Sequence, residues 1–180
     1  MVDCPSVLAS DMDGTFIPLD GNAENQRDLD LLAEELRRMQ VELLYVTGRH
    51  FDLAMEAVHG HGLPLPAWLI CDVGTSIYHR DEDNQYSLEE PYAEHLDEIV
   101  DQIDVNRLHQ HLSGIEGLVL QPLEKQGRFK LRYDCDANRL IELTQQVLET
   151  LSLTRAPYRE IASVDPFTGG GLIDLLPRGV

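Results

Sequence analysis

The 180-residue chain has a mass of 20.3 kDa and is 43% hydrophobic, enough for one domain or two small ones with an apolar core, which argues against disorder throughout. Its 32 acidic and 14 basic residues give a net charge of −18, so we expect neither a nucleic acid nor an anionic membrane as a partner. Three scattered cysteines without a CxxC pair favour a reducing, cytoplasmic location.

The first third of the chain predicts strands that alternate with helices. Residues 6–10, 41–46 and 68–71 are short, largely apolar runs that predict strands. Residues 23–40 and 51–58 carry apolar side chains at helical spacing. Apolar strands separated by helices are typical of a parallel α/β sheet covered on both faces.

The composition changes after Tyr78, and the acidic stretch 80–90 predicts a linker or a turn between strands. The rest of the chain predicts an α+β unit. Its expected helices cover 92–103, 105–112 and 137–151, and its expected strands cover 118–123, 128–133, 158–164 and 172–176.

The strongest candidate site is the sequence Asp11-Met12-Asp13-Gly14-Thr15, directly after the first strand. Side chains two residues apart on an extended backbone point the same way, so both carboxylates can meet at the carboxyl edge of the sheet. Two such carboxylates suit a magnesium ion, and one of them could attack phosphorus while the other transfers a proton. The alternative is a turn that caps the following helix.

A second candidate site, Thr47-Gly48-Arg49, follows the second strand. A threonine hydroxyl and the amides of a glycine turn that opens a helix can bind an anion. Arg49 could add positive charge there, or it could be a surface residue at the start of the helix. The two motifs lie one βα unit apart, and together they are a more specific signal than Thr47-Gly48-Arg49 alone.

With these two motifs the sequence resembles the haloacid dehalogenase-like phosphatase superfamily. Three further segments resemble its sucrose-phosphate phosphatase branch and related sugar phosphatases. They are Val73-Gly74-Thr75-Ser76-Ile77-Tyr78, Phe129-Lys130-Leu131-Arg132-Tyr133 and Leu172-Ile173-Asp174-Leu175-Leu176-Pro177. The similarity extends over nearly the whole chain, in order and in spacing.

The resemblance implies a parallel-sheet α/β core with an inserted α+β cap. Residues 1–79 would form the amino-terminal part of the core, residues 80–177 the cap, and residues 178–180 the start of the return to the core. Asp11 would be the nucleophile that forms an aspartyl-phosphate. Asp13 would be the general acid and base, and the two aspartates would hold Mg²⁺.

The resemblance further implies that Thr47, Gly48 and Arg49 bind the phosphoryl group. Lys130 falls where the branch carries a cap lysine near the sugar. The alternative for Lys130 is a solvated residue on a strand of the cap. The implied function is hydrolysis of a sugar phosphate of the sucrose-phosphate type.

The superfamily's third and fourth motifs, a lysine and an acidic magnesium-binding loop, have no counterpart before Val180. The resemblance therefore implies an amino-terminal portion whose core is incomplete. The alternative function is a sugar-phosphate-binding module or fragment that cannot hydrolyse its ligand. A partner chain or a missing carboxyl-terminal segment would then complete the core.

Overall fold

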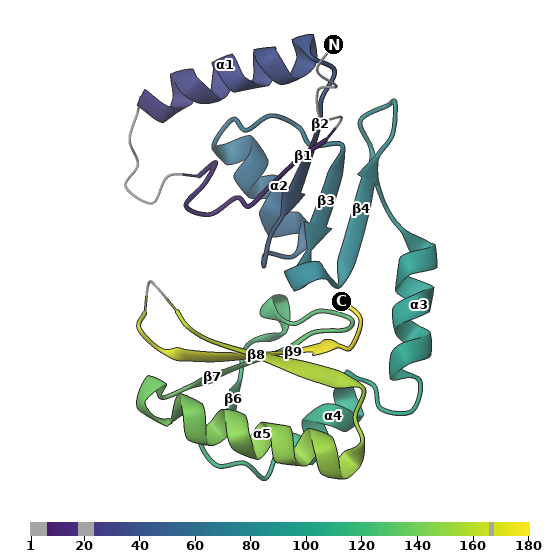
Figure 1. Cartoon of the computed structure of the whole chain (residues 1–180), viewed down its shortest axis with the longest axis vertical. Helices are drawn as coiled ribbons and strands as arrows, with labels where there is room; N and C mark the ends of the chain where they lie inside the picture. Colours follow the sequence, from purple (N-terminus) through teal and green to yellow (C-terminus); the bar gives the residue numbers. More distant parts are fainter. Residues whose placement is uncertain (1–6, 18–23, 166–167) are drawn as a thin grey trace, which may run out of the picture. The chain divides into compact units, whose positions relative to one another are not determined.

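The computed structural model describes residues 7–17, 24–165 and 168–180. The chain divides into two compact units, Met1–Glu90 and Pro91–Val180, and both can be followed along the chain in Figure 1. Among the residues that the structure describes, no helix combines the length and the apolar character needed to cross a membrane.

The first unit is an α/β unit with a five-stranded sheet in the order β1-β2-β3-β4-β5. Strands β1, β2 and β3 are parallel, and β4 and β5 add to β3 as antiparallel strands. The elements are β1 Val7–Ser10, α1 Glu24–Arg38, β2 Glu42–Val46, α2 Phe51–Gly60, β3 Trp68–Cys71, the 3₁₀ turn η1 Asp72–Gly74, β4 Ser76–Arg80 and β5 Tyr86–Leu88. The prediction of an α/β unit with a parallel sheet at its centre is confirmed.

Both helices of this unit pack on one face of the sheet. Alternate residues of the central strands, such as Leu43, Tyr45 and Leu69, are buried in one cluster with apolar residues of α1 and α2. The strand order moves in one direction from β1 to β3, and right-handed crossovers then place both helices on the same side. The position of the helices therefore follows from the order of the strands.

The other face of the sheet is open in the described structure. Val7 and Val46, which point to it, are 48% and 40% exposed, and Trp68 and Ile70 on the same face are half-buried. The expectation of a sheet covered on both faces is therefore wrong for the described residues, because two successive crossovers in one direction cover only one side.

The boundary between the units falls later than the change of composition suggested. The predicted core ended at residue 79, whereas the first compact unit runs to Glu90. The acidic stretch 80–90 contains the turn of a hairpin, because Tyr78 pairs with Leu88 and Arg80 with Tyr86. Of the two predictions for this stretch, the turn between strands is confirmed.

The second unit is an α+β unit with a four-stranded antiparallel sheet in the order β6-β7-β9-β8. Helices α4 and α5 lie along this sheet, as Figure 1 shows. Its elements are α3 Glu90–Val100, α4 Val105–Leu112, β6 Val119–Leu120, η2 Leu123–Lys125, β7 Leu131–Cys135, η3 Ala137–Arg139, α5 Leu140–Thr154, β8 Tyr158–Val164 and β9 Gly171–Pro177. Each predicted helix and strand of this unit is present, with shifts of a few residues at the ends.

The core of the second unit lies between its sheet and the helices. Leu143, Val147 and Leu151 form the buried stripe of α5, at the i, i+4, i+8 spacing that places them on one side of a helix. Tyr133 of β7 and Ile173 of β9 are buried and paired across the strands. The side chains on the other face of this sheet are then left to form a polar network.

The buried stripe of α5 gives a first prediction. We expect Leu143→Ala to lower the free energy of unfolding by about 2 to 5 kcal/mol, because it leaves a cavity in a well-packed core. Ile141→Ala, on the same helix but at a side chain that is 88% exposed, should change it by less than about 0.5 kcal/mol. Urea unfolding followed by circular dichroism measures both, and equal effects of the two substitutions would contradict this packing.

Candidate active site

The first predicted motif forms a closed turn after β1. Met12 is fully buried, whereas its neighbours Asp11 and Asp13 are exposed, as the alternation of an extended backbone requires. The Gly14 N–H donates to the carbonyl of Ile17 at 2.8 Å, and the Ile17 N–H donates to the carbonyl of Met12 at 2.8 Å. Gly14 has a φ of 79°, a conformation that glycine adopts without strain.

The carboxylate of Asp11 accepts a hydrogen bond within its own turn. The Met12 N–H donates to Asp11 Oδ1 at 2.7 Å, and Asp11 is an exposed residue. The bond limits the rotation of the side chain and therefore favours one orientation of the carboxylate.

The second predicted motif follows β2. Thr47 is buried, and its N–H extends the pairing of β2 with β3 by donating to the Ile70 carbonyl at 2.9 Å. The Thr47 hydroxyl accepts from the Arg49 N–H at 3.2 Å. Gly48 is exposed between them, and helix α2 begins at Phe51. A hydroxyl and backbone amides near a helix start suit an anion.

Arg49 joins the two motifs. Its Nε donates to Asp13 Oδ2 at 3.0 Å and its Nη2 to Asp13 Oδ1 at 2.7 Å, a bidentate pair of the kind that carboxylates form with guanidinium groups. These bonds hold the pKa of the Asp13 carboxyl below its usual 3.8, although burial opposes part of the shift. The same pair raises the pKa of Arg49. Asp13 is therefore ionised in this arrangement.

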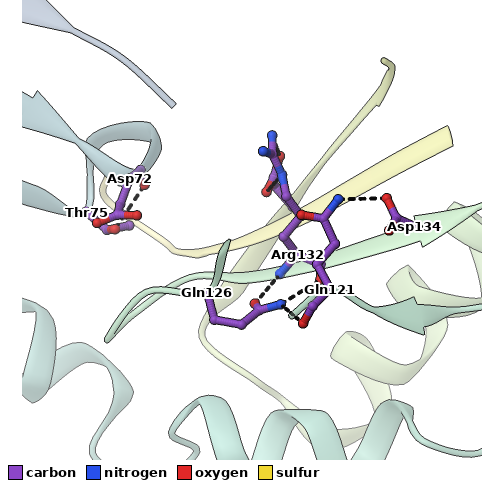
Figure 2. Close-up of polar contacts among 7 residues, drawn as sticks. Asp72, Thr75, Gln121, Gln126, Arg132 and Asp134 are labelled. Atoms are coloured by element: carbon purple, nitrogen blue, oxygen red, sulfur yellow. Dashed lines mark hydrogen bonds and ion pairs between the residues drawn. The ribbon is translucent and has the colours of Figure 1, made fainter. Parts of the chain in front are cut away.

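The turn after β3 contains polar residues that the sequence did not single out for chemistry. Asp72 is 6% exposed and Thr75 is 1% exposed, and Figure 2 shows the hydrogen bond from the Thr75 hydroxyl to the Asp72 carbonyl, 3.0 Å long. The Ser76 hydroxyl donates to Asp72 Oδ2 at 3.2 Å. An aspartate directly after an apolar strand, as at Asp11, was the signal that could have found Asp72.

Lys130 lies in the second unit, one residue before β7, and is 2% exposed. The alternative of a solvated lysine on a strand is therefore wrong. A buried lysine needs a compensating interaction, and Lys130 is not without one. It follows Phe129, which is also buried.

A polar network covers the face of the second sheet that points away from α5. Arg132 Nε and Nη2 donate to the two carboxylate oxygens of Asp174 at 2.8 and 2.9 Å across β7 and β9. Gln121 Nε2 donates to Asp134 Oδ1 at 2.7 Å. Gln126 bonds to the backbone of both flanking segments, as Figure 2 shows.

The sequence predicted Asp11 and Asp13 as the ligands of a magnesium ion. No three His, Cys, Asp or Glu side chains gather in the part of the chain that the structure describes. Mg²⁺ is commonly held by one or two carboxylates together with waters and substrate phosphate, so two aspartates fit its chemistry. Both oxygens of Asp13 are bonded to Arg49, which leaves the Asp11 carboxylate and backbone carbonyls as donors.

One cavity among the described residues lies elsewhere. It has a volume of about 900 Å³ and is lined by residues from the end of α1, the start of β2 and the end of β4, including Arg37, Leu43 and Arg80. This is the amino edge of the parallel strands, whereas the aspartates and Thr47 follow their carboxyl ends. This cavity and the two motifs therefore lie at opposite edges of the sheet.

The structure thus brings some of the predicted site residues into contact. Asp13 contacts Arg49, and Thr47 contacts Arg49 through its hydroxyl. Asp11 bonds within its own turn. Lys130 belongs to the other compact unit.

The parallel β1-β2-β3 order, with an aspartate-rich turn after β1 and a threonine turn after β2, defines a haloacid dehalogenase-like α/β fold. Residues 4–180 match the sucrose-6F-phosphate phosphohydrolase family, and the chain belongs to that family. The resemblance found in the sequence is confirmed.

Similar proteins support the same assignment. The chain is 35% identical over 176 residues to a HAD-like hydrolase from Nitrosococcus oceani, covering 96% of this chain and 46% of that protein. The solved sucrose-phosphatase from Synechocystis sp. PCC6803, in complex with sucrose and phosphate, is 28% identical with a TM-score of 0.76. A haloacid dehalogenase-like hydrolase from Bacillus subtilis, 17% identical with a TM-score of 0.59 over 99% of this chain and 68% of that one, supports the fold alone.

The chain is shorter than these relatives. It spans about half the length of the Nitrosococcus hydrolase, and the match to the Synechocystis sucrose-phosphatase takes in 97% of this chain but 65% of that one.

The ion pair gives a second prediction. We expect Arg49→Met to raise the pKa of Asp13, because the two hydrogen bonds that lower it are lost while the burial that raises it remains. Carboxyl ¹³C titration by NMR measures this pKa. The matched control is Arg38→Met, which removes an exposed pair with Glu35 on α1 and should leave Asp13 unchanged.

The sign of the accompanying stability change is fixed by linkage. With its pKa lowered, the folded chain binds fewer protons at Asp13 than the unfolded chain, so the ion pair stabilises above the usual 3.8 and this contribution is lost as the pH falls through the lowered value. Arg49→Met should flatten that part of the stability profile. An Asp13 pKa that does not change in the variant would contradict the assigned contact.

Proposed function

We propose that the protein is a magnesium-dependent phosphomonoesterase that hydrolyses a sugar phosphate of the sucrose-phosphate type through an aspartyl-phosphate. The observation that carries the proposal is the contact of Arg49 with Asp13 across β1 and β2, which joins the two motifs that the sequence predicted. Membership of the sucrose-6F-phosphate phosphohydrolase family supports the substrate class.

In the proposed reaction Asp11 is the nucleophile. An oxygen of its carboxylate attacks phosphorus, the bond from phosphorus to the sugar oxygen breaks, and the leaving oxygen takes a proton from Asp13. A water molecule then attacks the aspartyl-phosphate and gives its proton back to Asp13, which releases inorganic phosphate and restores Asp11. Bound Mg²⁺ would neutralise charge on the phosphoryl oxygens.

Binding of the phosphoryl group is assigned to the turn after β2. The Thr47 hydroxyl and the Gly48 amide would donate hydrogen bonds to its oxygens. Arg49 would move from Asp13 to the phosphoryl group, because a carboxyl that stays paired with a guanidinium stays ionised and has no proton to give. The exchange of partners would therefore couple the arrival of the anion to the protonation of Asp13.

Recognition of the sugar is assigned to the second unit, which we propose to be a cap. Lys130 is the candidate for this role. The network around Arg132 and Asp174 offers further polar groups, among them the buried Gln121 Oε1, which has no hydrogen-bond partner within the described structure. The Synechocystis sucrose-phosphatase, solved in complex with sucrose and phosphate, supports a sugar as the leaving group.

A second candidate function is binding of a sugar phosphate without turnover. The observation that favours it is the small number of cationic and metal-binding groups: the chain's two lysines are both at or beyond residue 125, and no three metal-ligating side chains gather among the described residues. Removal of charge-stabilising groups of this kind lowers rates by orders of magnitude.

The test is phosphate release from a panel of phosphorylated sugars, with and without Mg²⁺. We expect Asp11→Asn to reduce turnover by at least about 10³-fold, because the nucleophile is lost, while binding of the sugar phosphate by calorimetry persists. Thr15→Ser, in the same turn, is the matched control and should keep its activity. Normal turnover by Asp11→Asn would exclude the aspartyl-phosphate, and binding without turnover by the unsubstituted chain would favour the second function.

We also propose that a further polypeptide, from a partner chain or a continuation of this one, covers the open face of the first sheet. The exposed Val7 and Val46 support this proposal, because apolar side chains gathered on a sheet face commonly mark an interface.

This proposal predicts a contrast between the two faces of β2. Val46→Asp should change the free energy of unfolding of the isolated chain by less than about 1 kcal/mol, since the side chain already meets water. Leu43→Asp, on the covered face and 5% exposed, should cost more than about 3 kcal/mol. Urea unfolding measures both, and a large cost of Val46→Asp would mean that the face is already covered.

A further inference from the structure

Three successive residues after β3 adopt the left-handed backbone conformation. The φ angles are 53° at Asp72, 59° at Val73 and 96° at Gly74. Glycine adopts this region freely, and aspartate is tolerated there, but a β-branched residue such as valine is a genuine outlier. Strain of this kind persists where the surrounding structure holds it, and it gathers at functional sites.

With this backbone conformation, two consecutive N–H groups donate hydrogen bonds to the turn that follows β2. The Asp72 N–H donates to the Arg49 carbonyl at 2.9 Å, and the Val73 N–H donates to the Thr47 carbonyl at 3.2 Å. In an extended strand consecutive N–H groups point to opposite sides. The left-handed pair is therefore what allows both of them to bond to the turn after β2.

The side chain of Val73 completes the contact. Its Cγ2 lies 3.8 Å from the place that a Cβ would take on Gly48. Arg49 is thus bonded to Asp72 and Thr47 to Val73, and Gly48 between them faces the Val73 side chain. The Thr75 hydroxyl donates to the carbonyl of Asp72, and the Ser76 hydroxyl donates to its carboxylate. These two hydrogen bonds stabilise the strained turn.

We infer that the Asp72–Val73 turn is a positioning element for the phosphate-binding turn Thr47–Arg49. This inference rests on the proposed function for the role of Thr47 and Arg49, and it assigns to residues 72 and 73 a role in that site. The two carbonyls that the turn holds flank Gly48. Fixing them orients the Thr47 hydroxyl, which accepts from the Arg49 N–H, and directs the Arg49 side chain to Asp13.

The test compares Val73→Gly with Gln40→Gly in the 180-residue chain. The Val73→Gly variant would keep the backbone N–H but lose the side chain and the restriction that a β-branched residue places on backbone motion, whereas Gln40 has a φ of 54° just after α1, away from the site. Hydrogen exchange at the Arg49 amide reports the geometry of the turn, and titration with inorganic phosphate reports its function. A Val73→Asn variant, which suits the left-handed region, repeats the comparison should the glycine variant fail to fold.

We expect the Arg49 amide to exchange at least about tenfold faster in Val73→Gly than in the unsubstituted chain, through local opening of the turn. Phosphate should bind about tenfold more weakly, the loss expected for one misplaced hydrogen bond to a charged ligand. The melting temperature should not fall, because glycine relieves the left-handed strain. Gln40→Gly should match the unsubstituted chain in exchange at Arg49 and in phosphate affinity.

Two outcomes separate this inference from the proposed function. Unchanged exchange at Arg49 in Val73→Gly, or a change equal to that in Gln40→Gly, overturns the positioning role whatever the chain binds. Faster exchange at Arg49 in a chain that binds no phosphate in any variant supports the positioning role and contradicts the proposed phosphate site.

Discussion

The parallel pairing of β1, β2 and β3 is the constraint on which the candidate site depends. Ser10 lies opposite Tyr45, and Tyr45 lies opposite Leu69, so the three strands end at one edge within one or two residues of each other. The turns that follow must then emerge side by side. Hydrogen bonds from the third turn to the second, and from Arg49 of the second to Asp13 of the first, are consequences of that register.

Charge decides what this edge can do. The chain is strongly acidic, and two exposed carboxylates at the site would repel a phosphate. Arg49 neutralises one of them through its bidentate pair with Asp13. In the proposed reaction the same guanidinium would pair with Asp13 before the substrate arrives and with the phosphoryl group afterwards.

The sequence predicted those parts of the site that follow from the position of a residue at the end of an apolar strand. Asp11, Asp13 and Thr47 stand directly after apolar strands, and such positions are informative because strand ends in a parallel sheet share an edge. The left-handed conformation of Val73 could not be predicted, because valine by itself disfavours a positive φ. Hydrogen bonds from this turn to residues 47 and 49, which are distant in sequence, impose it. The burial of Lys130 could not be predicted from the sequence either, because the exposure of a residue beside a strand depends on which side chains pack over it.

The strand order that creates the site also leaves one face and one edge of the sheet open among the described residues. Movement in one direction from β1 to β3 puts both helices on one face and leaves β1 paired on one side only among the described strands. A polypeptide that paired with the free edge of β1 and covered Val7 and Val46 would come to lie next to Asp11, because Asp11 directly follows that strand. The same segment would then cover the apolar face and supply further groups to the site. In that case the stability of this sheet and the activity of the site at its carboxyl edge would depend on one segment.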